Sequence, residues 1–106
     1  MYGQESVVRM YGKFEFRSHI YISFELLSMN LYEFLKMNSF RGMSFSLIRR
    51  ITIQCLQALM FTKRNKIIHC DLKPENVLLK DSAKSGIKVI DFGSSCFDDE
   101  KMYSYI

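Results

Sequence analysis

Two short motifs place acidic, amide and basic side chains where together they could transfer a phosphoryl group. Residues 69–76 read His-Cys-Asp-Leu-Lys-Pro-Glu-Asn, and residues 91–93 read Asp-Phe-Gly. In such a transfer the protein mainly positions the reacting groups and neutralises charge. Asp71 is expected to accept the proton of an attacking hydroxyl, while Asn76 and Asp91 supply the oxygen ligands that Mg²⁺ prefers. The motifs therefore predict an active site that uses ATP and Mg²⁺.

The spacing matches the protein-kinase signature at every fixed position except one. That signature reads His-Arg-Asp-Leu, three residues, Asn and then Asp-Phe-Gly, and here Cys70 stands where arginine is usual. Lys73 resembles the lysine that contacts the γ-phosphate in serine/threonine kinases, which favours Ser/Thr of protein substrates as acceptors. His69 is interpreted as a hydrogen-bonding scaffold rather than a base. An isolated acid or lysine is usually a solvated surface charge, but the complete set in register favours a catalytic site.

Composition is typical of a small intracellular globular protein. The 106 residues are 48% hydrophobic and 25% charged, and no run of 18 apolar residues predicts a membrane span. The net charge of +4 is scattered, so no nucleic-acid partner is expected. Three cysteines without a Cys-x-x-Cys pair argue against a zinc site, and the N-terminus lacks a signal-peptide pattern. We expect a reducing compartment, in the cytoplasm and/or the nucleus.

Hydrophobic periodicity and turn residues predict a mixed α+β arrangement around the two motifs. Asn30 can cap a short helix, and Ser44 or Ser46 can cap a longer one. In chain order the expected elements are extended segments at 7–11 and 14–16, a turn at 17–19, a strand at 20–26, a helix over Leu31–Met37, a helix at 46–64, and strands at Val77–Leu79 and 87–90.

The longer helix has an apolar face that is expected to pack against later helices of a complete kinase domain and to be left open in this fragment alone. Residues at three- and four-residue steps lie on one side of a helix. Cys55 on this face is interpreted as a small buried apolar residue, not a ligand. The residues expected on this apolar face are Ile48, Ile51, Thr52, Cys55 and Leu59.

Four segments carry a narrower resemblance. They are residues 24–33 (Phe-Glu-Leu-Leu-Ser-Met-Asn-Leu-Tyr-Glu), residues 69–71 (His-Cys-Asp), residues 88–96 (Lys-Val-Ile-Asp-Phe-Gly-Ser-Ser-Cys) and residues 103–106 (Tyr-Ser-Tyr-Ile). Together they resemble the dual-specificity tyrosine-regulated kinases, the DYRK family, and most closely its class II branch. The resemblance extends over nearly the whole chain.

This resemblance implies a partial protein-kinase fold of the α+β class. Residues of about 1–27 would form small-lobe strands and the hinge. Residues 28–106 would form the start of the large lobe, with the catalytic loop, the metal-binding loop and the beginning of the activation segment.

The resemblance also implies roles in nucleotide binding. Phe24 would be the gatekeeper behind the adenine ring, and the backbone of Glu25 and Leu27 would bond its edge. Leu78 would form the apolar floor of the pocket. For Phe24 and Leu78, an ordinary place in the core is compatible with these roles.

Four side chains are candidates for modification. Tyr105 matches the activation-loop tyrosine that family members autophosphorylate, with Tyr103 as the less favoured alternative. Cys70 is expected to face the segment that contains Cys96, so the two form a possible redox pair. Two thiols that never pair remain the more favoured interpretation in a reducing compartment.

Two expected kinase elements are missing from these 106 residues. The five glycines form no Gly-x-Gly-x-x-Gly motif, and no Val-Ala-Ile-Lys strand supplies the phosphate-binding lysine. The chain therefore reads as an internal fragment of a kinase domain, which alone should be inactive and poorly folded. The alternative function is that of a noncatalytic, truncated kinase-like chain that acts as a binding or regulatory module.

Overall fold

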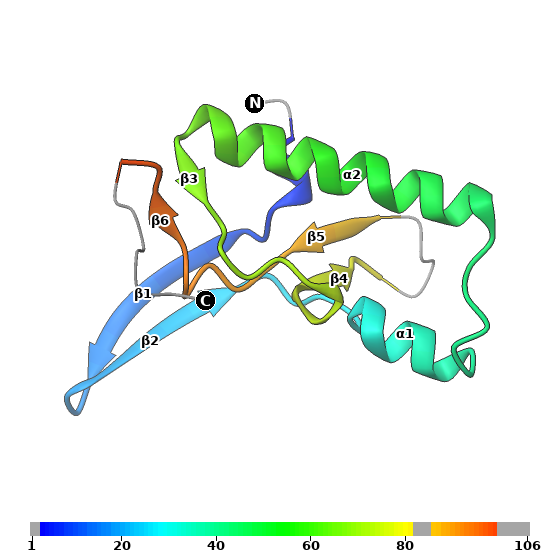
Figure 1. Ribbon diagram of the computed structural model, residues 1–106. Coiled ribbons are helices and arrows are strands. Elements are labelled where there is room, and N and C mark those ends of the chain that lie inside the picture. Colours follow the sequence, from blue (N-terminus) through cyan, green and yellow to red (C-terminus); the bar gives the residue numbers. More distant parts are fainter. Residues whose placement is uncertain (1–2, 82–85, 100–106) are drawn as a thin grey trace.

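The computed structural model describes residues 3–81 and 86–99, which form helices and short strands of the expected α+β class (Figure 1). Three antiparallel pairs of strands are present in these residues: β1 with β2, β3 with β6, and β4 with β5. No helix in the described parts is long and apolar enough to cross a membrane. The elements are η1 (Gln4–Ser6), β1 (Met10–Phe16), β2 (His19–Phe24), α1 (Leu31–Met37), α2 (Phe45–Arg64), β3 (Ile67–Ile68), η2 (Pro74–Asn76), β4 (Val77–Leu79), β5 (Ile87–Val89) and β6 (Cys96–Phe97).

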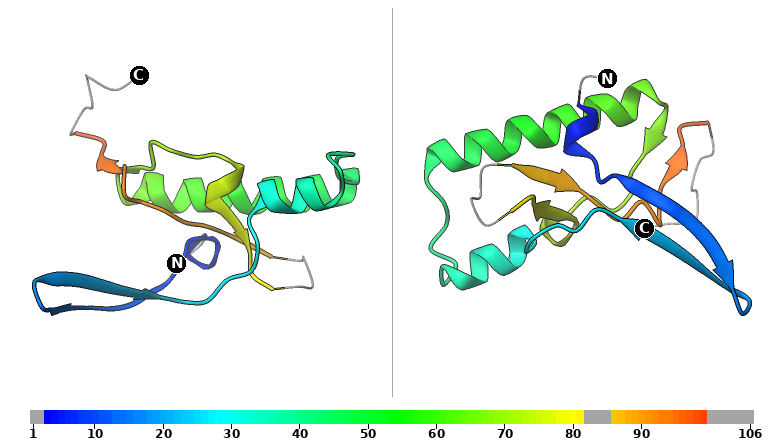
Figure 2. Two further views of the ribbon diagram at one scale, coloured as in Figure 1. Left: turned by 90° about the horizontal axis from the view of Figure 1, so that it is seen from below. Right: turned by 180° about the vertical axis from the view of Figure 1, so that it is seen from behind.

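The β1–β2 hairpin projects away from the remainder of the molecule (Figure 2). Its two-residue turn, Arg17 and Ser18, has positive φ angles of 50° and 64°. Positive φ at both central residues suits the right-handed twist of a hairpin. His19, expected in the turn, is instead the first residue of β2 and pairs with Phe16.

Both predicted strands of the hairpin are longer than the observed ones. Residues 7–9 lie outside β1, and the first two of them contact β5: Val7 bridges Val89, and the N–H of Val8 donates to the carbonyl of Val89 at 3.0 Å. At the other end, β2 stops at Phe24, and the N–H of Glu25 donates to the carbonyl of Arg9 at 3.0 Å. The hairpin is thereby joined at its base to the strand that precedes the Asp-Phe-Gly motif.

Both helices begin at polar caps. The predicted bounds of α1 are confirmed, and Asn30 and Glu33 form a complete capping box in which each side chain accepts the backbone N–H of the other, at 2.7 and 3.1 Å. Ser44, rather than Ser46, caps α2, since its hydroxyl accepts the N–H of Leu47 at 3.2 Å. The helix therefore starts at Phe45, one residue earlier than expected.

The hydrophobic core lies between α1, α2 and the β4–β5 pair, with α2 running over these strands (Figure 1). Met29, Met43, Leu47 and Cys55 pack around it. Burial raises the pKa of the Cys55 thiol, as expected for an apolar environment. The buried core residues are Leu31, Phe34, Ile51, Val77, Leu79 and Ile87.

The predicted apolar face of α2 is buried in part only, in keeping with the expectation that this fragment leaves it open. Ile51 is buried and Cys55 is half-buried, but the buried stripe continues through Ala58 and Thr62. These steps of four, three and four residues follow the helical period of 3.6, so the buried face is rotated from the expected one. The predicted face residues that are exposed are Ile48, Thr52 and Leu59.

Candidate active site

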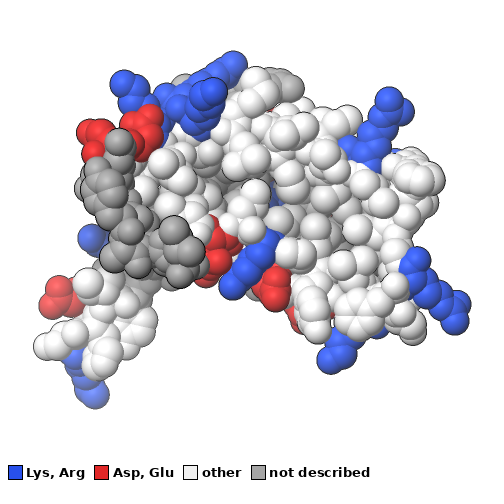
Figure 3. Space-filling view, viewed as in Figure 1, with Lys and Arg blue, Asp and Glu red and all other residues white. Residues whose placement is uncertain are grey.

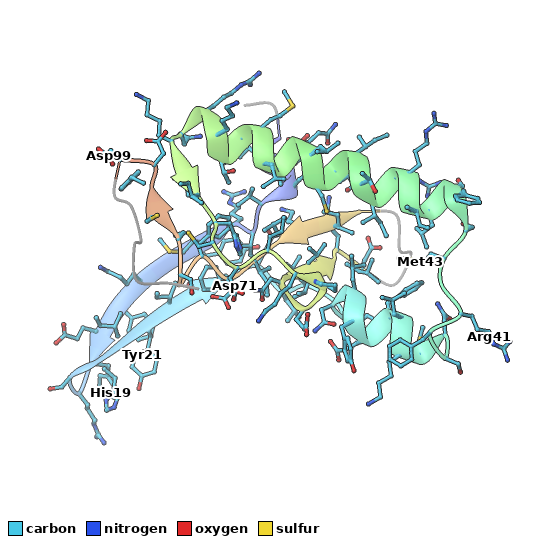
Figure 4. All side chains as sticks on the ribbon, in the orientation of Figure 1. His19, Tyr21, Arg41, Met43, Asp71 and Asp99 are labelled. Atoms are coloured by element: carbon cyan, nitrogen blue, oxygen red, sulfur yellow. The ribbon has the colours of Figure 1, made fainter. Side chains whose placement is uncertain are left out.

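The loop with the first motif lies near the centre of the molecule, where Figure 4 places Asp71. It leaves α2 through β3, which is held by pairing with β6. The loop then forms η2 and enters β4, which pairs with β5. Strands β4 and β5 both belong to the core, so the loop is supported from both ends.

His69 connects the loop to the second motif. Its ring is 5% exposed, and its Nδ1 accepts the N–H of Asp71 at 3.1 Å. A backbone N–H can only donate, so the proton of the neutral ring lies on Nε2, which donates to the carbonyl of Ile90 at 2.8 Å. The ring also meets Phe92 edge-on, with centroids 4.7 Å apart. This geometry is that of a scaffold, because both ring nitrogens are engaged with backbone groups.

The side chains of Asp71, Lys73 and Asn76 converge. Lys73 Nζ lies 3.5 Å from Asp71 Oδ1, and Asn76 Nδ2 donates to the backbone carbonyl and to Oδ2 of Asp71, at 2.9 and 3.4 Å. Lys73 and Asp71 are 49% and 32% exposed, so their ion pair contributes little stability. The ion pair mainly orients the carboxylate of Asp71 beside the ammonium of Lys73, and both groups are accessible from solvent.

Asp91 comes directly after Ile90, whose backbone groups bond the catalytic loop. The N–H of Ile90 donates to the carbonyl of Asn76 at 2.9 Å, and the carbonyl of Ile90 accepts from His69. Asp91 has a φ of 60°, a left-handed conformation that aspartate tolerates better than most residues. Its carboxylate is exposed, and Oδ1 accepts the N–H of Gly93 at 3.2 Å.

The donors at this site suit a hard cation. Because Asn76 Nδ2 is directed at Asp71, its amide oxygen is the atom that could bind a metal. Within residues 3–81 and 86–99, no group of three or more His, Cys, Asp or Glu could hold a metal ion by itself. Mg²⁺ is commonly bound by one or two carboxylates together with water and substrate phosphates, so Asp91 with Asn76 fits that cation.

Three of the four predicted nucleotide-binding residues lie along one segment, and the fourth, Leu78, lies in the strand that pairs with it. Phe24 ends β2 and is 50% exposed, and Glu25 and Leu27 follow it. This segment pairs with β4, because Asn30 bridges Leu78, the N–H of Ser28 donates to the carbonyl of Leu79 at 2.8 Å, and the N–H of Leu79 donates to the carbonyl of Met29 at 2.9 Å. The backbone therefore brings the four predicted residues to neighbouring elements.

The described residues also enclose a cavity of about 720 Å³, and none of the four predicted nucleotide-binding residues lines it. It lies beside η1 and the start of β1, at residues Gln4, Glu5, Val7, Val8, Arg9, Met10, Phe61 and Lys88.

Glu25 forms an ion pair that sequence reasoning missed. Lys88 Nζ lies 2.6 Å from Glu25 Oε2, and the same oxygen accepts the N–H of Arg9 at 2.7 Å. Burial alone would raise the pKa of the Glu25 carboxyl, but these two hydrogen bonds outweigh burial and hold the pKa below its ordinary value. Since Lys88 is 63 residues from Glu25, only the otherwise apolar neighbourhood of Lys88 in the sequence could have suggested a buried partner.

The two cysteines of the possible redox pair are brought together. Cys70 Sγ and Cys96 Sγ are 3.8 Å apart, and both side chains are half-buried thiols. The pairing of Ile68 with Cys96 in the β3–β6 ladder explains this proximity. Cys70 has a φ of 73°, which is costly for a residue with a Cβ atom.

Tyr103 and Tyr105, the candidate phosphorylation sites, lie outside the described residues.

Lys and Arg side chains are seen at several separate places on the face shown in Figure 3.

Comparison with known proteins identifies the family of this chain. Residues 1–104 match the model of the protein kinase domain. The chain is 55% identical over 104 residues to the dual specificity tyrosine-phosphorylation-regulated kinase mbk-2 of Caenorhabditis elegans, covering 98% of this chain and 13% of that protein. It is 55% identical over 101 residues to the probable serine/threonine-protein kinase dyrk2 of Dictyostelium discoideum, covering 95% and 11%. It is 53% identical over 104 residues to the human dual specificity tyrosine-phosphorylation-regulated kinase 3, covering 98% and 18%.

The chain thus spans less than a fifth of the length of these relatives, and it does so within their kinase-like sequence. The sequence resemblance, the partial α+β fold and the arrangement of Asp71, Asn76 and Asp91 all agree. The chain belongs to the protein kinase family, and its relatives within that family are the DYRK kinases.

Proposed function

We propose that these residues form the catalytic centre of an ATP-dependent protein kinase that phosphorylates serine and threonine. The observation that carries the proposal is the hydrogen-bonded set at Asp71. Its carboxylate is accessible, is oriented by Asn76 and lies 3.5 Å from the ammonium of Lys73. A general base for a hydroxyl and a cation for a phosphate are thereby placed side by side.

Each side chain has a separate task in this proposal. Asp71 accepts the proton of the substrate hydroxyl, and Lys73 offsets negative charge on the transferred phosphoryl group. Asn76 and Asp91 would hold Mg²⁺, which neutralises phosphate charge when bound. His69 keeps the base and the metal aspartate in a fixed relation, because it bonds the backbone at both.

Autophosphorylation is the finer part of the proposal. Tyr105 is proposed as the tyrosine modified during maturation, on its position in Tyr-x-Tyr after Asp-Phe-Gly. Two of the three named relatives carry the name dual specificity tyrosine-phosphorylation-regulated kinase, which supports this assignment.

The test uses the full-length protein with Mg²⁺, ATP and a serine-containing peptide library. Asp71→Asn should lower the turnover number by at least about 10²-fold while leaving ATP affinity nearly unchanged, because only the base is lost. Asp99→Asn is the matched control, since Asp99 is exposed and lies far from Asp71 in Figure 4. ATP binding without any phosphoryl transfer by the wild-type protein would instead support the noncatalytic binding module.

A further inference from the structure

The carboxylate oxygen Oε2 of Glu25 joins two segments of the chain that have different tasks in the proposed reaction. Glu25 belongs to the segment predicted to bond adenine through its backbone, and Lys88 precedes the metal ligand Asp91 by three residues. Lys88 Nζ and Glu25 Oε2 are 2.6 Å apart, and the two side chains are only 11% and 17% exposed. The pair therefore links the segment predicted to bind adenine to β5, the strand that precedes the proposed metal ligand Asp91.

A third segment meets at the same oxygen. The N–H of Arg9 donates to Glu25 Oε2 at 2.7 Å, and the N–H of Glu25 donates to the carbonyl of Arg9 at 3.0 Å. Next to Arg9, the N–H of Val8 donates to the carbonyl of Val89 in β5 at 3.0 Å. These contacts use the carboxylate and the N–H of Glu25 and do not involve its carbonyl.

The lysine is well placed to act as a fixed support. Lys88 is the central residue of β5, and its backbone is paired opposite Leu78 in β4. Strands β4 and β5 contribute Leu79 and Ile87 to the buried core. A largely buried charge that loses its partner is strongly unfavourable, so the pair resists separation.

We propose that Lys88 is a positioning residue for nucleotide binding: its ammonium holds Glu25 and thereby sets the position of the hinge segment relative to the strand that carries Asp91. The inference rests on the proposed kinase function. Lys88 does not touch Asp71, so its loss should affect the binding of ATP more than the rate of the chemical step. A pair that merely stabilised the fold would lower the melting temperature and leave the ATP affinity of the folded protein unchanged.

The experiment compares variants of the full-length protein. Lys88→Met and Glu25→Gln each remove one charge at nearly constant volume, the double variant completes a thermodynamic cycle, and Lys88→Arg keeps the positive charge. Lys13→Met is the matched control, because Lys13 is exposed in β1. Each variant is measured for the dissociation constant of ATP with Mg²⁺ by calorimetry, for KM and kcat, and for its melting temperature.

We expect Lys88→Met and Glu25→Gln each to raise the dissociation constant about tenfold, within the usual range of coupling between sites, with kcat changed less than about threefold. The double variant should lose no more than either single variant, Lys88→Arg should recover most of the affinity, and Lys13→Met should behave as wild type. ATP affinity within about twofold of wild type for Lys88→Met, or an equal loss in kcat, would overturn the proposal.

Three further outcomes are decisive. If all three charge-removing variants are unfolded at the assay temperature, the pair supports the fold and the positioning role is refuted. If the wild-type protein binds ATP but transfers no phosphoryl group, the proposed function fails, while the binding measurements still decide the role of Lys88. A wild-type protein that binds no ATP would refute both.

Discussion

Replacing His69 by alanine is expected to release the catalytic loop from the strand that leads to Asp91. The ring of His69 is 5% exposed and makes two hydrogen bonds, from the N–H of Asp71 and to the carbonyl of Ile90. The substitution leaves both backbone groups without their partner, and it removes the edge-on contact with Phe92.

The magnitude follows from these contacts. A buried polar group left unsatisfied costs about 1–3 kcal/mol, and an aromatic pair contributes about 0.5–1.5 kcal/mol beyond area burial. We expect His69→Ala to lower the free energy of unfolding by about 3–5 kcal/mol, out of a typical total of about 5–15 kcal/mol. Phosphoryl transfer should fall as well, because the N–H of Asp71 loses its acceptor.

His19 provides a matched control. It lies at the hairpin, far from Asp71 (Figure 4), and its exposed ring makes one hydrogen bond through Nδ1 with the carbonyl of Arg17 at 2.9 Å. His19→Ala should therefore change the free energy of unfolding by no more than about 0.5 kcal/mol. The assay is urea unfolding of both full-length variants, followed by far-ultraviolet circular dichroism. Equal midpoints for the two variants would refute the scaffold role of His69.

Asp91→Asn should raise the Mg²⁺ concentration needed for half-maximal phosphoryl transfer, because a charged ligand is lost; an unchanged requirement in a Mg²⁺ titration would exclude Asp91 as a ligand. Mild oxidation should join Cys70 and Cys96, whose sulfurs are 3.8 Å apart, and mass spectrometry of the wild type and of Cys96→Ser would detect the bridge. Two free thiols after oxidation would argue against a redox pair. Because the pKa of Glu25 is lowered in the folded state, its contribution to stability is present above the ordinary pKa of about 4.3 and is lost as the pH falls through the lower, folded value. Glu25→Gln should show a smaller loss of stability than wild type on acidification below about pH 4.3, and identical acid titrations would contradict this.

Features determined by local sequence were predictable. Asn30 and Glu33 are three residues apart, so the start of α1 is fixed by side chains that meet within one turn. The contact of Asp71 with Asn76 likewise spans five residues. The motifs and caps therefore indicated both the first helix and the centre of the proposed catalytic site.

Features determined by packing were not predictable to the same degree. The rotation of α2 about its axis depends on where β5 lies, and neighbouring steps of three or four residues gave more than one acceptable apolar face. Val7 and Val8 are extended in either case, but their partner is Val89 of β5. The pair of Glu25 with Lys88 depends on the same tertiary arrangement.

The separation in sequence of these contacts also bears on the order in which the chain folds. Asp71 and Asn76 close a loop of five residues, His69 and Ile90 one of 21, and Glu25 and Lys88 one of 63. Closing the longest loop costs about 2 kcal/mol more chain entropy than closing the shortest, at about 0.6 kcal/mol for each doubling of length. We expect the capped helices and the β1–β2 hairpin to form early and the hinge segment to join β5 last. A newly made chain would then possess its catalytic loop before it can hold a nucleotide beside it.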